Sequence, residues 1–204
     1  RQIVLAGAGI NLERYKMQPY PKHTRIHFLY LGRIMKEKGI DELFYAVRHL
    51  KKENENFVLD LVGFFEDEYK EQVKELEKHS IAHFYGFQSD PRPFYIEADC
   101  VVLPSYHEGM SNVLLEAAAT GRPVVTSNIP GCRESVENGK SGLLVEVKNK
   151  EMLYDAMKEM LHCSREEREQ MGQAGREKME REFRKEVVVE KTVQSLRGDE
   201  KRDF

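Results

Sequence analysis

The sequence lacks the features that several classes of protein require. No apolar run approaches the roughly 20 residues that a membrane-spanning helix needs. The three cysteines (Cys100, Cys132 and Cys163) are scattered and form no CxxC pair, which argues against a metal or redox site and favours a reducing cytosol. The net charge of -3 gives no indication of a nucleic-acid-binding surface. There is also no GxxxxGK[ST] phosphate loop and no His, Asp and Glu grouping with metal-ligand spacing, so we expect a cytoplasmic protein without a bound metal.

The 204 residues, 40% hydrophobic and 33% charged, suffice for one compact domain with its own core. There is no signal peptide, but Arg1-Gln2-Ile3-Val4 does not resemble a natural start, so we expect a piece of a longer protein. Asn11–His23 is polar and rich in proline, which is typical of a linker. Gly7-Ala8-Gly9 looks like the opening of a dinucleotide fingerprint, but Leu12 replaces the third glycine. No long helix follows before Pro19, and NAD binding is therefore disfavoured.

From residue 25 to residue 164 short apolar runs alternate with segments of helical spacing. Strands are predicted at Ile26–Gly32, Phe57–Gly63, Ile81–Tyr85, Asp99–Leu103, Pro123–Thr126 and Gly142–Val145. Helices are predicted at Ile40–Lys51, Glu66–His79, Pro93–Ala98, Val113–Thr120, Lys150–Leu161, Arg165–Glu182 and Lys185–Leu196, with a short turn at Arg133–Val136. This alternation predicts an α/β fold: a Rossmann-like three-layer sandwich with a six-stranded parallel sheet.

Residues 165–204 are heavily charged and carry only a thin apolar stripe. The stripe consists of Met171, Met179, Phe183, Val187, Val189 and Val193. Two interpretations stay open. The helices are either a solvated pair on the surface, as charge runs usually are, or they pack on a partner domain.

The most informative segment is Ser105–Glu116, which joins a buried strand to a helix. Glu108 lies in the loop, and Glu116 lies about one turn inside the helix. Between them the backbone N–H groups of Ser111–Val113 have no intrahelical partner and can face an anion. Carboxylates accept sugar hydroxyls, and amides at a helix start donate to phosphate. The segment thus offers both halves of a nucleotide-sugar site, at the end of a strand where open α/β sheets bind ligands.

A second polar loop, Gly32–Gly39, follows the first strand. Arg33 can hold a diphosphate through two parallel hydrogen bonds, and Lys38 can add a point charge. The alternative is an ordinary basic loop, and Lys36 is expected to face solvent. The placement of this loop beside Ser105–Glu116 favours the diphosphate interpretation.

Four further segments are ambiguous. Tyr85-Gly86-Phe87, at the end of the third strand, could let a flat base approach the backbone or could simply pack. Gly131–Glu134 is either part of a sugar pocket or a structural turn. His107 is a candidate for a residue of the same pocket. Glu66-Asp67-Glu68 lies at a predicted helix start, where acids favour the helix dipole, so capping is preferred over a metal site.

Together these motifs resemble the C-terminal, donor-binding domain of family-4 retaining glycosyltransferases of the GT-B fold, over about Ile3 to Leu161. Glu108 and Glu116 match that family's EX7E motif, and Arg33 with Lys38 resembles its diphosphate clamp. The flanking matches are Pro104–Gly109, Gly121–Val125 and Gly139–Val145. Gly131–Glu134 is similar to group 1 members that build bacterial capsule, exopolysaccharide or O-antigen.

The resemblance implies roles for individual residues. Arg33 and Lys38 would bind the donor's diphosphate and stabilise the leaving group. Glu108 would contact the donor sugar, Glu116 the ribose, and the amides of Asn112–Leu114 a phosphate. Donor contacts are also implied for Gly32, Phe87, His107, Gly109, Met110, Ser111, Asn112, Val113 and Leu114. Members of this family need no metal or other cofactor.

The resemblance covers only half of such an enzyme. Residues 1–24 would end an N-terminal domain and form the interdomain linker, residues 25–164 would bind the nucleotide-sugar, and residues 165–204 would pack back on the absent domain. That domain would bind the glycan or lipid-linked acceptor and make any contact with the inner face of the plasma membrane. The chain alone would therefore bind the donor, with UDP preferred over GDP, and transfer little or no sugar. Two alternatives are a nucleotide-sugar epimerase of the same fold and a non-catalytic nucleotide-binding or assembly module.

Overall fold

The computed structural model describes residues 9–53 and 55–199, so the predictions for Arg1–Val4 and Gly7-Ala8 lie outside it. Six strands pair in parallel in the order β3-β2-β1-β4-β5-β6. They are β1 (Ile26–Leu31), β2 (Phe57–Val62), β3 (Ala82–Gly86), β4 (Cys100–Leu103), β5 (Val124–Ser127) and β6 (Gly142–Val145). The predicted α/β fold with a six-stranded parallel sheet is confirmed.

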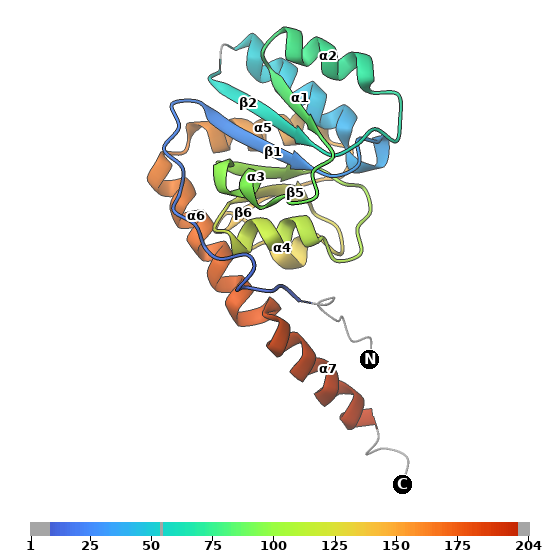
Figure 1. The fold of residues 1–204 in the computed structure, drawn as a ribbon, viewed down its shortest axis with the longest axis vertical. Coiled ribbons are helices and arrows are strands. Elements are labelled where there is room, and N and C mark those ends of the chain that lie inside the picture. The colour runs from blue at the N-terminus through green and yellow to red at the C-terminus, as the bar shows by residue number, and fades with distance from the viewer. Residues whose placement is uncertain (1–8, 54, 200–204) are drawn as a thin grey trace.

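Helices cover both faces of this sheet (Figure 1). They are α1 (Ile40–Lys52), α2 (Lys70–Lys78), α3 (Arg92–Glu97), α4 (Asn112–Ala119), α5 (Lys150–His162), α6 (Arg165–Lys178) and α7 (Lys185–Asp199). α1 packs against α5 on one face, α3 and α4 lie on the other, and α6 runs alongside α4. None of the helices in the described ranges has the length and apolar character needed to cross a membrane.

Burial on both faces explains the strand sequences. Every residue of β2 and of β4 is buried, including Asp60, whose carboxylate pairs with His27 Nδ1 at 2.7 Å. Continuous apolar runs are the pattern of parallel strands sandwiched between helices. α1 instead buries one stripe with helical spacing, formed by Ile40, Leu43, Phe44, Val47 and Leu50.

Two predicted helix boundaries differ from those in the structure. α2 starts at Lys70 rather than at Glu66, because residues 64–67 hydrogen-bond to the loop after β1. The helix predicted from Arg165 through Glu182 is α-helical only to Lys178, where a π-helical turn, Met179–Phe183, follows.

The N-terminal segment, which we expect to be an interdomain linker, packs on the domain. Arg122, which is fully buried, donates to the carbonyl oxygens of Gln18 and Pro19. Farther along, the Ile10 N–H donates to the Phe183 carbonyl at 2.7 Å. The start of the described chain therefore lies beside the turn between α6 and α7.

Part of the chain beyond the expected boundary at residue 164 packs on the central domain. α6 packs on α4, and Met179 and Phe183 of the apolar stripe are buried in this domain. α7 instead extends away from the domain (Figure 1), and its Val189 and Val193 side chains are exposed. For α7 the expectation of a partner domain stays a prediction.

Candidate functional site

The two polar loops meet where the strand order reverses. β1 and β4 are neighbours in the sheet, but β1 connects toward β2 and β4 toward β5. Gly39, in the left-handed conformation at φ 73°, lies so close to Pro104 that an added Cβ would be 2.1 Å from its carbonyl oxygen. Only glycine fits there. This contact joins the loop after β1 to the loop after β4 at a topological switch point, where open α/β sheets bind ligands.

Lys38 and Glu108 form the centre of the site. Lys38 Nζ lies 2.7 Å from Glu108 Oε1, and both side chains are about 15% exposed. The Ser105 hydroxyl donates to the same oxygen at 2.8 Å. The order of the loops in the sequence predicts that Lys38 and Glu108 are neighbours, but Ser105 was not among the predicted site residues; its signal is its position two residues after the end of β4. The three side chains form a charged, hydrogen-bonded group at the switch point.

Arg33 lies at the same edge but has a different partner. Its Nη1 is 2.8 Å from Glu66 Oε2, in an ion pair that is nearly half exposed. The neighbouring Asp67 carboxylate accepts the Lys36 backbone N–H at 2.8 Å. The interpretation of residues 66–68 as a helix cap is therefore wrong, because α2 begins after Tyr69, and two of the three acids bind the loop after β1.

α4 presents its amino end to this edge. Ser111 precedes the helix without a side-chain cap, and its hydroxyl is buried. In the described ranges no acceptor is found for the backbone N–H groups of Asn112, Val113 and Leu114, the first hydrogen bond being Leu115 N–H to Ser111 O. Such amides and the positive end of the helix dipole favour an anion. The Leu114 side chain is fully buried, so only its amide could contact a ligand.

Glu116 lies one turn farther along, between two tyrosines. The Tyr95 hydroxyl donates to Glu116 Oε2 at 2.9 Å, and the Tyr15 hydroxyl also hydrogen-bonds to this carboxylate. Burial raises the pKa of Glu116, and these two hydrogen bonds offset the rise only partly. Tyr15 comes from the N-terminal segment, 101 residues away in the chain, and no local pattern revealed it.

The turn at Gly131 contacts the loop after β4. An added Cβ on Gly131 would lie 1.6 Å from the Gly109 carbonyl oxygen, and the Ser111 N–H donates to Gly131 O at 2.9 Å. The predicted turn therefore borders the site. His107 and Gly109 are exposed on the same loop, and Met110 packs partly on the core.

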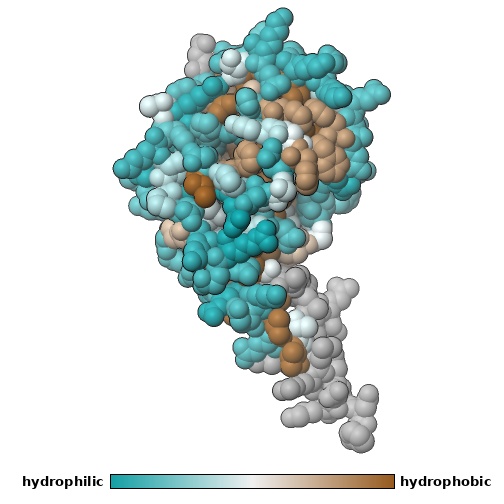
Figure 2. All heavy atoms as spheres, in the orientation of Figure 1, coloured by the Kyte–Doolittle hydropathy of each residue, from teal (hydrophilic) through white to brown (hydrophobic). Residues whose placement is uncertain are grey.

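Aromatic rings extend the edge beyond β1. Phe87, after β3, is 70% exposed, and Phe64, after β2, is 48% exposed, with their ring centroids 6.4 Å apart. Figure 2 shows a hydrophobic patch at the upper right of this face, over the carboxyl ends of the strands. Sequence reasoning identified Phe87 but missed Phe64. The signal was the repeated Gly–Phe pair, since Gly63 and Gly86 each end a strand run.

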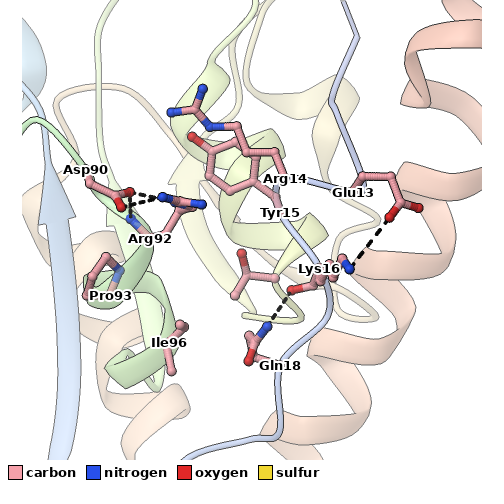
Figure 3. A pocket seen from close by; sticks show the side chains of 10 residues that line it. Glu13, Arg14, Tyr15, Lys16, Gln18, Asp90, Arg92, Pro93 and Ile96 are labelled. Carbon is pink, nitrogen blue, oxygen red and sulfur yellow. Dashed lines mark hydrogen bonds and ion pairs between the residues drawn. The ribbon is translucent and has the colours of Figure 1, made fainter.

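A pocket of about 430 Å³ opens between the N-terminal segment and α3 (Figure 3). Arg14 lies over the Tyr15 ring on one side, and Arg92 pairs with Asp90 on the other. Tyr15 connects this pocket to Glu116. Across the described part of the chain no three metal-ligating side chains come together, so no metal centre is assigned.

The family described as Glycosyl transferases group 1 matches residues 13–178. The capsular polysaccharide biosynthesis glycosyltransferase CapM of Staphylococcus aureus is 28% identical over 193 residues, which cover 89% of this chain and 50% of that protein. The chain thus spans about half the length of this curated relative.

Solved structures share the fold. The Anabaena protein HepE, in complex with UDP and glucose, aligns with a TM-score of 0.77 at 20% identity over 92% of this chain and 55% of its own. A structure described as the C-terminal domain of a group 1 glycosyl transferase, LpcC of Francisella tularensis, aligns with a TM-score of 0.70 at 24% identity. It covers 86% of this chain, and the match covers 99% of that domain.

Proposed function

Since the chain belongs to the group 1 family of glycosyl transferases, we propose that it is the donor-binding domain of a retaining glycosyltransferase. The enzyme would transfer a sugar from a UDP-linked donor to a glycan or lipid-linked acceptor during synthesis of a bacterial surface polysaccharide. The observation that carries the proposal is the Lys38–Glu108 contact of 2.7 Å at the switch point, beside the open amino end of α4.

The proposed roles are those that the family resemblance implies, and the chemistry of each group is compatible with them. Lys38 and Arg33 bind the donor's diphosphate and neutralise the charge that develops as the sugar–phosphate bond breaks, in place of a metal ion. The free amides at the start of α4 donate to phosphate oxygens. Glu108 accepts hydroxyls of the donor sugar, and Glu116 accepts the ribose hydroxyls.

The coverage of relatives supports the role of a half enzyme. The chain matches half of a curated relative and nearly the whole of a solved C-terminal domain. We propose that an N-terminal domain binds the acceptor and makes any contact with the inner face of the plasma membrane. The isolated chain is then expected to bind the donor and to transfer no sugar. Appreciable transfer by this chain alone would contradict the proposal.

Calorimetric titration of the chain with UDP, GDP and ADP tests donor binding. We expect UDP to bind with a stoichiometry of one and more tightly than GDP or ADP. Tighter binding of GDP would support a donor site in this chain but would show that the donor is GDP-linked. The absence of binding by all three would contradict a donor site formed by this chain alone.

Replacing Glu116 with glutamine is expected to stabilise the free domain while weakening nucleotide binding. Burial raises the pKa of Glu116, so ionisation costs stability once the pH exceeds the ordinary value of 4.5, and the full cost applies above the raised pKa. Glutamine removes that cost and keeps an acceptor for Tyr95. The Tm of Glu116→Gln should therefore exceed the wild-type value at pH 7.5, by about 2–4 °C for each kcal/mol of ionisation cost that the substitution removes. At pH 4.5 the two Tm values should match.

The matching binding measurement is a UDP titration of Glu116→Gln at pH 7.5. A carboxylate accepts ribose hydroxyls more strongly than an amide does, so affinity should fall by about tenfold. A variant that is both less stable at pH 7.5 and unchanged in affinity would show that Glu116 serves the fold alone.

A further inference from the structure

The ion pair of Arg33 and Glu66 is positioned by the backbone on both sides. Beyond the ends of β1 and β2 the two segments that follow these strands stay paired. The Ile34 N–H donates to Phe64 O at 2.8 Å, and the Glu66 N–H donates to Ile34 O at 3.1 Å. The fully buried Tyr30 donates its hydroxyl to the Arg33 carbonyl oxygen at 2.5 Å. The backbone at Arg33 and at Glu66 is therefore held by hydrogen bonds, and the fold brings the two side chains into contact.

The geometry of the pair leaves one edge of the guanidinium open. Both Glu66 oxygens accept from the same nitrogen, Arg33 Nη1, at 2.8 and 3.1 Å. Within the described ranges no acceptor is found for Arg33 Nε or Nη2. These two nitrogens form the side edge of the guanidinium, which can hold two oxygens of one phosphate through parallel hydrogen bonds.

We propose that Glu66 is a positioning residue that holds Arg33 by Nη1 and directs its Nε–Nη2 edge toward the donor's diphosphate. This inference rests on the proposed function. Arg33 is 48% exposed and on a free surface would sample many rotamers, whose loss on binding costs affinity. Glu66 reduces that cost because the arginine is already oriented before the ligand arrives.

A carboxylate near an anion site also repels the ligand, so charge and positioning must be separated. Glu66→Gln and Glu66→Ala remove the same charge, but only glutamine keeps an acceptor for Nη1. Their difference in affinity therefore measures the positioning of Arg33. The exposed Glu68, two residues along, supplies the control pair Glu68→Gln and Glu68→Ala.

The experiment is calorimetric titration of these variants with inorganic pyrophosphate and with UDP, repeated in an Arg33→Ala background. We expect Glu66→Gln to bind pyrophosphate about threefold more tightly than Glu66→Ala, in keeping with the modest strength of exposed ion pairs. The difference should disappear when Arg33 is alanine, and it should be absent at Glu68.

Equal affinities of the two Glu66 variants, a difference that persists without Arg33, or no pyrophosphate binding by any variant would each overturn the inference. Comparing pyrophosphate with UDP distinguishes a failure of this inference from a failure of the proposed function. If pyrophosphate follows the expected pattern and UDP binds no more tightly than pyrophosphate, the positioning of Arg33 stands and the nucleotide-sugar proposal fails.

Discussion

Replacing Lys38 with alanine is expected to weaken UDP binding by about tenfold to a hundredfold. A charge-assisted hydrogen bond in a partly buried site contributes about 1.5–3 kcal/mol, and Lys38 is the most buried cation at the switch point that we assign to phosphate. The substitution also leaves Glu108 without its ion-pair partner at 2.7 Å, so a bare carboxylate would face the incoming phosphates. Calorimetric titration with UDP at pH 7.5 measures the loss.

Lys36→Ala provides a matched control, because both lysines lie in the same short 3-10 turn. Lys36 is exposed, and its hydrogen bond to Asp67 uses the backbone N–H, which the substitution keeps. We expect its UDP affinity to stay within about twofold of the wild-type value. Equal losses in the two variants would show that the loop acts only through its overall charge and would remove Lys38 from the site.

A double variant separates the two effects of losing Lys38. In the double variant Lys38→Ala with Glu108→Gln, the unpaired carboxylate is gone. Part of the lost affinity should return if repulsion by Glu108 contributed to the loss. No recovery would assign the whole effect to the missing contact between Lys38 and phosphate.

The sheet could be predicted from the sequence because parallel strands covered on both faces are short, continuous apolar runs. Cys100–Leu103 is such a run, and Phe57–Val62 is interrupted only by Asp60; both strands are completely buried. The same reasoning brought Lys38 and Glu108 together, since loops that follow neighbouring parallel strands leave the sheet at one edge. The sequence pattern therefore predicts the place of a residue where burial and strand direction alone determine that place.

The remaining contacts of the site depend on tertiary packing that no local pattern records. The Glu66–Arg33 pair requires β1 and β2 to continue their pairing past their ends, which also delays the start of α2 to Lys70. The contact of Tyr15 with Glu116 requires the N-terminal segment to fold back over α3 and α4. In both cases the two partners lie more than 30 residues apart in the chain, and the local pattern around Glu66 or Tyr15 predicts something else, a helix start for Glu66 and a linker for Tyr15.

Replacing Arg122 with methionine is expected to reduce the free energy of unfolding by about 3–5 kcal/mol, comparable with breaking a buried charge interaction. The Arg122 guanidinium is fully buried, and its hydrogen bonds all go to backbone carbonyls, those of Gln18, Pro19, Tyr95, Ile96 and Gly121. Burial lowers its pKa to about 10, so it stays charged at neutral pH. Methionine would fill much of the volume but leave these carbonyl oxygens without their donor, and each costs free energy when buried. Urea denaturation followed by circular dichroism measures the loss.

Arg165→Met is the matched control. Arg165 packs on the same Tyr20 ring as Arg122, with guanidinium carbons 5.7 and 5.4 Å from its centroid, and it donates to the carbonyls of Tyr20 and Pro21 from α6. It is one-third exposed, so water can replace its hydrogen bonds, and we expect a loss below about 1 kcal/mol.

Because Arg122 fastens the segment that carries Tyr15, the Arg122→Met substitution should also speed proteolysis within residues 11–23 and weaken UDP binding under conditions where the domain stays folded. If both variants lost the same stability and neither opened this segment to protease, the hydrogen bonds of Arg122 would not be what fastens the segment to the domain.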